Sequence, residues 1–275
     1  MRVLNKYSVL MSICKKEKSD WLKQSIESML NQSIKTNDFV IVCDGVLTDE
    51  LYSVLSMYEN KYPDLFQIIK RDKNYGLGPS LAYGLNFCKN EFVARMDSDD
   101  ISKSNRCEEE FKLFDKNPEL DIVGCWENEF EVYGKVLSIH KVPSGVDNVK
   151  AFMRRRCSLL HPTVIFKKSA VIKSGNYQDI RLLEDYDLFM RMVVEHNCKA
   201  DNVQEALYDM RVNDDFYKRR GGFKYMNTIV AFKKKQRKKG FMSIKDYLIS
   251  CWSQRIICLM PNKMRKWVYL KFLRK

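Results

Sequence analysis

Apolar and polar positions alternate in blocks through the first hundred residues of the chain. Short apolar runs bounded by turn residues predict buried strands over 7–13, 39–43, 65–70 and 91–96. The segments between them have apolar residues at helical spacing and predict helices over 20–32, from about 49 to 62, and from the turn at 74–79 to about 88. Strands that alternate with helices in this way are typical of right-handed βαβ units and a parallel sheet.

The second half of the chain has a less regular pattern. Further strands are predicted over 122–126, 136–140 and 163–166, and further helices over 104–117, 147–156 and 185–195. The chain contains no internal repeat and no flexible linker. The predicted fold class is therefore α/β, with a sheet flanked by helices and a helical appendage at the C-terminus.

The appendage differs from the rest of the chain in charge. The protein carries a net +13, but from Lys218 onward it has 18 Lys or Arg and a single acid, so the preceding 217 residues have a net charge of −4. Apolar residues recur there at helical spacing up to Pro261, among them Trp252 and Ile256. Large apolar side chains mixed with Lys and Arg predict a helix on an anionic membrane surface. An ordinary helical pair with a solvated basic face is the alternative, and the Lys233–Lys239 run lacks the aromatic residues that would favour nucleic acid.

Composition narrows the class of protein further. Hydrophobic residues make up 45% of the chain, with 11 Gly and 6 Pro, which excludes disordered and collagen-like classes. No apolar run reaches the ~18 residues of a membrane span, and Lys6 interrupts the opening segment where an export signal would be apolar. Nine Cys without C-x-x-C spacing favour a reducing, intracellular setting, and three His leave only a hard, oxygen-bound metal to be expected.

Acidic residues follow the fourth predicted strand in the sequence Asp97-Ser98-Asp99-Asp100. Three carboxylates in four residues repel one another unless a cation is bound, and oxygen ligands suit a divalent ion. Acidic turns without a metal are also common, so the motif alone leaves both readings open. Ligands of such sheets bind beyond the carboxyl ends of the strands, where Cys14-Lys15-Lys16 and Asp44-Gly45 also lie. These three features are expected to converge on one site.

Five other residues are candidates for chemistry. Glu184 and Asp185 open a predicted helix, where they either cap the helix or supply a general base. His161 offers a polar contact or is a satisfied loop residue. Arg219 and Arg220 precede two glycines, and they either bind a phosphate group or form the start of the solvated basic tail.

Taken in order, these motifs resemble the family 2 glycosyltransferases of the GT-A fold, over roughly residues 7–222. The resemblance is carried by the opening strand and five motifs at the family's spacing, namely Val42-Cys43-Asp44-Gly45, Asn74-x-Gly-Leu-Gly, Ala94 to Asp100, His161-Pro162-Thr163 and Glu184-Asp185-Tyr186. The group is similar to bacterial enzymes that build exopolysaccharide, capsule or O-antigen, the amylovoran type. It implies a catalytic domain over 1–222 and a membrane-associating helical region over 223–275.

The resemblance also implies roles for individual residues. Asp44 is expected to contact uracil, Asp97 the ribose or metal region, and Asp99 a Mn²⁺ or Mg²⁺ ion on the diphosphate of a UDP-sugar. Asp185 is the expected base for the acceptor hydroxyl in an inverting transfer, and Glu184 supports it. The expected donor-binding residues are completed by Arg71, His161, Arg219 and Arg220.

The implied partners are a UDP-sugar and an undecaprenyl-diphosphate-linked saccharide at the inner leaflet of the cell membrane, with no nucleic acid. The enzyme is accordingly expected in the cytoplasm, peripheral on that leaflet. Two departures from the family pattern matter. Cys43-Asp44 replaces the usual Asp-Asp pair, and no Gln-x-x-Arg-Trp follows Asp185, which favours transfer of a single sugar. A nucleotidyltransferase and a non-catalytic binding module are the competing interpretations.

Overall fold

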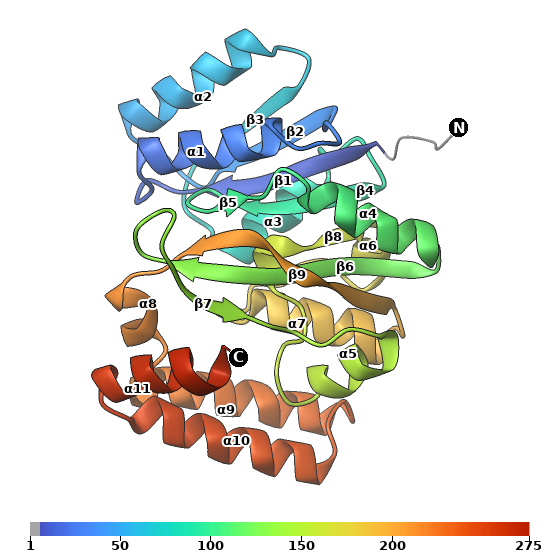
Figure 1. Ribbon diagram of the computed structural model, residues 1–275, viewed down its shortest axis with the longest axis vertical. Coiled ribbons are helices and arrows are strands. Elements are labelled where there is room, and N and C mark those ends of the chain that lie inside the picture. The colour runs from blue at the N-terminus through green and yellow to red at the C-terminus, as the bar shows by residue number, and fades with distance from the viewer. Residues whose placement is uncertain (1–5, 275) are drawn as a thin grey trace.

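The four apolar segments of the first hundred residues form neighbouring parallel strands, as predicted. In the computed structural model, which describes residues 6–274, the sheet has nine strands in the order β3-β2-β1-β4-β8-β6-β9-β5, with β7 paired to β6 (Figure 1). The parallel half consists of β1 (Tyr7–Ile13), β2 (Asp38–Cys43), β3 (Phe66–Lys70) and β4 (Phe92–Asp97). Residues 1–5, used for the export argument, and Lys275 lie outside the described residues.

The other half of the sheet is mixed. The short strand β8 (Ile165–Lys167) runs antiparallel to both β4 and β6 (Leu120–Phe130), and the 13-residue β9 (Lys199–Arg211) pairs parallel with β6. The edges are completed by β5 (Ile101–Ser102) on β9 and β7 (Val136–His140) on β6. The sequence did not predict β9, because polar residues break its apolar alternation, and its register against β6 shifts more than once. Its pairing with β6 overrides this weak local signal.

Helices cover both faces of the sheet, because successive side chains of β1 point to opposite sides. On one face, Val9 and Met11 share a core with α1 (Ser19–Leu30), α2 (Asp49–Lys61) and α4 (Arg106–Lys116). On the other face, Leu10 shares a core with α3 (Leu77–Leu85), α5 (Val146–Met153), α6 (Lys168–Lys173), α7 (Glu184–Met190) and α9 (Gly222–Lys238). The result is a three-layer arrangement of helices, sheet and helices (Figure 1).

Three local predictions needed correction. The helix expected over 185–195 begins at Glu184 as α7, and from Arg191–Glu195 it widens into a π-helical turn. The helix expected over 147–156 ends at Met153. The strand expected from Thr163 starts at Ile165 instead, because His161–Thr163 forms a 3₁₀ turn with Pro162 in it.

The C-terminal region is helical, as expected. After α8 (Asp214–Arg219) and α9 come α10 (Ile244–Leu259), α11 (Asn262–Val268) and a π-helical turn (Tyr269–Leu273), which returns the chain to β7 (Figure 1). Phe232 of α9 is buried and its ring lies 5.3 Å from that of Tyr186 in α7. Hydrophobic packing thus attaches α9 to the main core. The division of the chain into a catalytic domain over 1–222 and a C-terminal region over 223–275 stays a prediction. Within residues 6–274, no helix is both long and apolar enough to cross a membrane.

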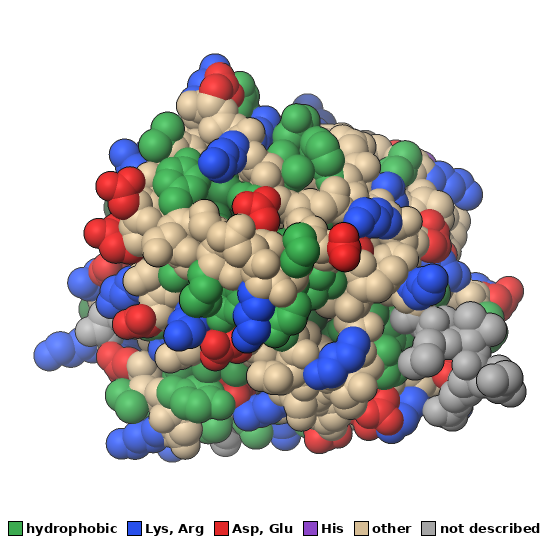
Figure 2. Space-filling model, turned by 90° about the horizontal axis from the view of Figure 1, so that it is seen from above, with side chains coloured by type: hydrophobic (Ala, Val, Ile, Leu, Met, Phe, Trp, Pro, Cys, Tyr) green, Lys and Arg blue, Asp and Glu red, His purple; other side chains and the backbone are tan. Residues whose placement is uncertain are grey.

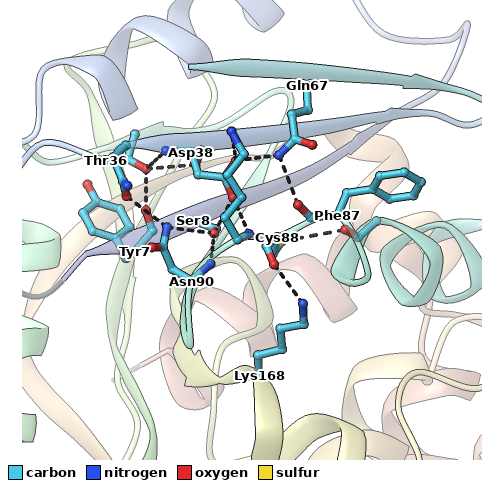
Figure 3. Close-up of polar contacts among 12 residues, drawn as sticks. Tyr7, Ser8, Thr36, Asp38, Gln67, Phe87, Cys88, Asn90 and Lys168 are labelled. Carbon is cyan, nitrogen blue, oxygen red and sulfur yellow. Dashed lines mark hydrogen bonds and ion pairs between the residues drawn. The ribbon is translucent and has the colours of Figure 1, made fainter. Parts of the chain in front are cut away.

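A buried carboxylate ties the amino ends of the central strands together, at the opposite end of the sheet from the acidic motif (Figure 3). Asp38 of β2 is fully buried and accepts hydrogen bonds from Ser8 Oγ (2.5 Å), Gln67 Nε2 (2.6 Å) and the Lys89 amide (2.8 Å). Asn90, before β4, donates its amide to Ser8 Oγ (3.1 Å). One side chain therefore links β1, β2, β3 and the approach to β4.

We predict that Asp38→Ala lowers the free energy of unfolding by about 3 kcal/mol, because three hydrogen-bond donors lose their buried acceptor. The exposed Asp115 on α4 provides a matched control, since Asp115→Ala should change stability by no more than ~0.5 kcal/mol. Urea denaturation of the two variants measures the difference. Equal stability of the two variants would contradict the structural role of Asp38.

Candidate active site at the carboxyl edge of the sheet

Two of the three strand-end features, Cys14-Lys15-Lys16 and Asp44-Gly45, line one cavity, and the acidic motif contributes only Ser98 to it. A cavity of about 650 Å³, here called the strand-end cavity, opens beyond the carboxyl ends of β1 and β2. It is lined by Ser12, Ile13, Cys14, Lys15, Lys16, Glu17, Asp44, Gly45, Val46, Leu47, Thr48, Asn74, Gly76, Leu77 and Ser98. Its volume lies in the range of small-molecule sites.

Asp44 fixes the wall of this cavity. Its Oδ1 accepts the amide N–H of Tyr75 (2.8 Å) and its Oδ2 accepts that of Gly76 (2.9 Å). Gly45 has φ +88°, and a Cβ there would lie 2.9 Å from the Asn74 amide nitrogen, so only glycine permits this approach. Asp44 therefore positions the loop at 74–76, and its contact with uracil stays a prediction.

Arg71 is not among the residues that line the strand-end cavity. Its guanidinium lies 3.8 Å from the centre of the Tyr75 ring and donates to Ser80 Oγ (2.9 Å). These contacts brace the loop at 74–76 against the start of α3. Donor binding by Arg71 stays a prediction.

The acidic motif gathers its carboxylates at the end of β4. One oxygen each from Asp97, Asp99 and Asp100 lie within 4.8 Å of one another. Burial, Asp97 and Glu17 raise the pKa of Asp99 to about 7. Burial and its two acidic neighbours raise the pKa of Asp100 well above its usual value. Asp100 joins the two metal-ligand candidates named from the sequence, although it is the most buried of the three.

Two arginines that the sequence reading did not single out offset this charge. Arg95 of β4 is buried and forms an ion pair with Asp97. Arg211, the last residue of β9, donates its amide to Asp100 Oδ1 (2.6 Å) and its Nε to the Asp99 carbonyl (2.9 Å). Arg95 belongs to the motif from Ala94 to Asp100. The position of Arg211 next to the acidic residues depends on β9, which the sequence did not predict.

The cluster suits a hard divalent cation. Its donors are all carboxylate oxygens, which Mg²⁺ and Mn²⁺ prefer. Burial and then repulsion from the neighbouring carboxylates raise the pKa values of Asp99 and Asp100, and a bound cation would stabilise their charged forms. Asp97 and Asp99 are the candidate ligands, because the carboxylate of Asp100 already accepts the Arg211 amide.

The second acidic pair faces the same space. A cavity of about 340 Å³, here called the acidic cavity, is lined by Leu77, Asp97, Asp99, Asp100, Leu182, Glu184, Asp185, Met210, Arg211, Phe216, Arg219, Arg220 and Tyr225. The structure thus brings together six of the predicted site residues: Asp97, Asp99, Glu184, Asp185, Arg219 and Arg220. The sequence could not show this proximity, because α7 and α8 are far from β4 along the chain.

Close packing places Glu184 and Asp185 there. A Cβ on Gly78 would lie 3.0 Å from the Glu184 Cβ, so glycine lets α3 approach the start of α7. Leu182 has φ +71°, a left-handed conformation that costs a leucine ~1 kcal/mol or more. Burial and then Asp185 raise the pKa of Glu184 to about 7, and burial raises the pKa of Asp185.

A third cavity adjoins the acidic one. It measures about 330 Å³ and is here called the arginine cavity. Its lining shares Asp97, Asp185, Met210, Phe216, Arg220 and Tyr225 with the acidic cavity and adds Glu127, His140, Arg156, Cys157, Leu159, Leu160, His161, Pro162, Tyr269 and Arg274. Of these added residues, the sequence had singled out only the segment that contains His161.

His161 is held as a neutral residue. It is buried, with Nε2 3.0 Å from the Tyr177 hydroxyl. Burial and then Arg95 lower its pKa well below the usual value. The satisfied-residue interpretation of His161 accounts for these contacts, and its role in donor binding stays a prediction.

Comparisons with known proteins agree with this architecture. The sequence pattern described as Glycosyl transferase family 2 matches residues 8–172. The chain is 33% identical over 271 residues, 98% of this chain and 97% of the relative, to the UDP-Gal:alpha-D-GlcNAc-diphosphoundecaprenol beta-1,3-galactosyltransferase of Escherichia coli. It is 31% identical to the amylovoran biosynthesis glycosyltransferase AmsE of Erwinia amylovora, over 96% of this chain and 98% of the relative.

A solved structure shares the fold at low identity. The mannosyltransferase PcManGT of Pyrobaculum calidifontis superposes with a TM-score of 0.65 at 11% identity, over 91% of this chain and 69% of that one. The mixed sheet with its flanking helices is thus GT-A-like, as the resemblance implied. The chain belongs to family 2 of the glycosyltransferases. This assignment replaces the nucleotidyltransferase and the binding module as interpretations.

Proposed function

We propose that this enzyme transfers one sugar from a UDP-sugar to a lipid-diphosphate-linked saccharide during synthesis of a bacterial surface polysaccharide. The observation that carries the proposal is the acidic cavity, where the metal-ligand candidates Asp97 and Asp99 share a lining with Glu184 and Asp185. The Escherichia coli relative, matched over nearly its whole length, is named for a UDP-galactose donor and a diphosphoundecaprenol acceptor. Amylovoran synthesis by a second relative supports the polysaccharide context.

The donor extends from the strand-end cavity into the acidic cavity. The nucleoside occupies the strand-end cavity beside Asp44, and the diphosphate lies at the acidic cluster, since Leu77 lines both spaces. Asp97 and Asp99 would hold Mn²⁺ or Mg²⁺, which supplies charge neutralisation for the diphosphate leaving group. The PcManGT complex with GDP-Man and Mn²⁺ supports this choice of ion. Arg219 and Arg220 contribute positive charge from the opposite wall.

Asp185 acts as the base in a single displacement. Its carboxylate takes the proton of the acceptor hydroxyl, the freed oxygen attacks the anomeric carbon, and the bond to UDP breaks on the opposite face, which inverts the configuration. Asp185 Oδ1 accepts the Tyr186 amide (2.7 Å), which orients the carboxylate at the start of α7. Its raised pKa makes it a stronger base than an exposed aspartate.

We predict that Asp185→Asn lowers kcat about 10²- to 10⁴-fold while UDP binding is retained, since the amide cannot accept the proton. In the native enzyme, kcat should start to fall as the pH drops through about 7, where Glu184 takes up a proton, and should fall further as Asp185, whose pKa burial also raises, is protonated and lost as the base. Transfer from radiolabelled UDP-sugars to a GlcNAc-diphosphate lipid measures both effects. Asp147→Asn, an exposed position on α5, is the matched control and should keep full activity. An Asp185→Asn variant with native kcat would refute this assignment.

We further propose that α10 and α11 dock on an anionic membrane. Apolar side chains recur along α10 and remain exposed, with Trp252 at 60% and Ile256 at 56%, and Trp267 of α11 is 53% exposed. The region from Lys218 onward has a net charge of +17, whereas basic and acidic side chains are interspersed on the face seen from the α2 end (Figure 2). Apolar side chains for the acyl boundary and cations for the headgroups support this docking mode.

We predict that the double variant Trp252→Ser, Trp267→Ser lowers partitioning onto phosphatidylglycerol vesicles at least about tenfold. Burying each large apolar side chain contributes ~1.5–3 kcal/mol to binding. The control is Met57→Ser, Val132→Ser, which removes exposed apolar side chains from α2 and from the turn after β6. Vesicle co-sedimentation compares the two. Equal partitioning of both variants would contradict docking through α10 and α11.

A further inference from the structure

The arginine cavity collects three guanidinium groups from separate parts of the chain. Arg156 follows α5, Arg220 follows α8, and Arg274 follows the last helical turn. Asp185, the proposed base, lines the same cavity. The proposed reaction assigns no role to Arg156 and Arg274.

Polar contacts hold two of these arginines in place. Arg274 Nε lies 2.7 Å from Glu129 Oε1, and its Nη1 lies 2.7 and 2.8 Å from the two ring nitrogens of His140. Arg156 Nη2 lies 3.0 Å from His140 Nε2 and donates to the Leu273 carbonyl (3.0 Å). The C-terminal turn is thereby joined to β7 and to the end of α5. A site fixed in this way needs little reordering when an anion binds.

The third arginine lies at the boundary of the two cavities. Arg220 lines both the acidic and the arginine cavity and donates Nη1 to the Phe216 carbonyl (3.0 Å). Its guanidinium lies 3.5 Å from the centre of the Phe216 ring. Among the described residues, Nη1 is the one nitrogen of this guanidinium that donates a hydrogen bond.

The acidic groups at this cavity balance the charge of its three arginines only in part. Glu129 pairs with Arg274, while burial and the neighbouring arginines lower the pKa of His140 well below its usual value, so it is neutral. Burial raises the pKa of Glu127 to about 8, and its Oε2 has no hydrogen-bond partner in the described part of the chain. Burial lowers the pKa of Arg156, and repulsion from the Arg274 guanidinium lowers it further. A doubly charged anion would relieve that repulsion.

We propose that the arginine cavity binds the diphosphate of the lipid-linked acceptor, an inference that rests on the proposed function. Guanidinium forks match phosphate oxygens in charge and geometry. A sugar attached to that diphosphate reaches Asp185, which lines both this cavity and the acidic one. Phe272, 66% exposed, lies two residues from Arg274, so the lipid chain leaves the cavity beside the proposed membrane face.

Two soluble acceptors test this assignment without a membrane. One is GlcNAc joined through diphosphate to a short alkyl chain, and the other is the alkyl GlcNAc glycoside without phosphate. Arg156→Gln is expected to lower kcat/KM for the diphosphate acceptor about 10- to 100-fold, in line with the loss of a charge-assisted contact. The same variant should change kcat/KM for the neutral glycoside less than about threefold, and Arg156→Lys should recover part of the loss.

The matched control is Arg154→Gln, two residues away, exposed, and outside the lining of the arginine cavity. It should behave as the native enzyme with both acceptors. Arg274→Gln gives a second, independent variant from the far end of the chain, and should show the same selective loss. Thermal unfolding confirms that each variant is folded before its kinetics are compared.

Three results would overturn the inference. Equal loss with both acceptors would assign Arg156 to general positioning. Weaker UDP binding in Arg156→Gln would assign the arginines to the donor diphosphate. Weaker binding to phosphatidylglycerol vesicles, with native kinetics on the short-chain acceptor, would assign them to lipid headgroups. A native enzyme that hydrolyses UDP-sugar but uses neither acceptor would instead count against the proposed acceptor class.

Discussion

Repulsion among the carboxylates of Asp97, Asp99 and Asp100 is the constraint on which the site depends. The turn that follows β4 brings them together, and one oxygen from each lies within 4.8 Å of the others. Two arginines offset part of this negative charge. Arg95 forms an ion pair with Asp97, and Arg211 donates hydrogen bonds to Asp100 Oδ1 and to the Asp99 carbonyl. This compensation is incomplete, since burial and then the charges of Asp97 and Glu17 raise the pKa of Asp99 to about 7. A divalent cation would neutralise the remaining negative charge and would in turn attract the diphosphate.

The rest of the chain completes this strand end. Arg211 is the last residue of β9, and Glu184 and Asp185 at the start of α7 line the acidic cavity. Arg274, after the C-terminal turn, forms an ion pair with Glu129. The C-terminal region therefore combines two features that a separate membrane anchor would lack. It exposes apolar side chains along α10 and α11, and it also lines a cavity that contains the proposed base.

The sequence predicted what local patterns encode. Apolar periodicity located β1 to β4, and acidic spacing located Asp97, Asp99 and Asp185. It did not predict β9, because pairing with β6, rather than apolar alternation, makes that strand. It also missed Arg156 and Arg274, because their burial depends on His140 and Glu129, contacts that join distant segments of the chain. A charged side chain that is buried by a contact with a distant segment does not change the apolar periodicity of its own segment, so the sequence does not indicate its burial.

The most direct test of this account is the affinity for UDP, measured by calorimetry with and without Mn²⁺, in the native enzyme and in Asp99→Ala. The account predicts that Mn²⁺ strengthens UDP binding to the native enzyme and that Asp99→Ala loses this metal-dependent part while remaining folded. The same UDP affinity with and without Mn²⁺ in the native enzyme, unchanged by Asp99→Ala, would contradict it.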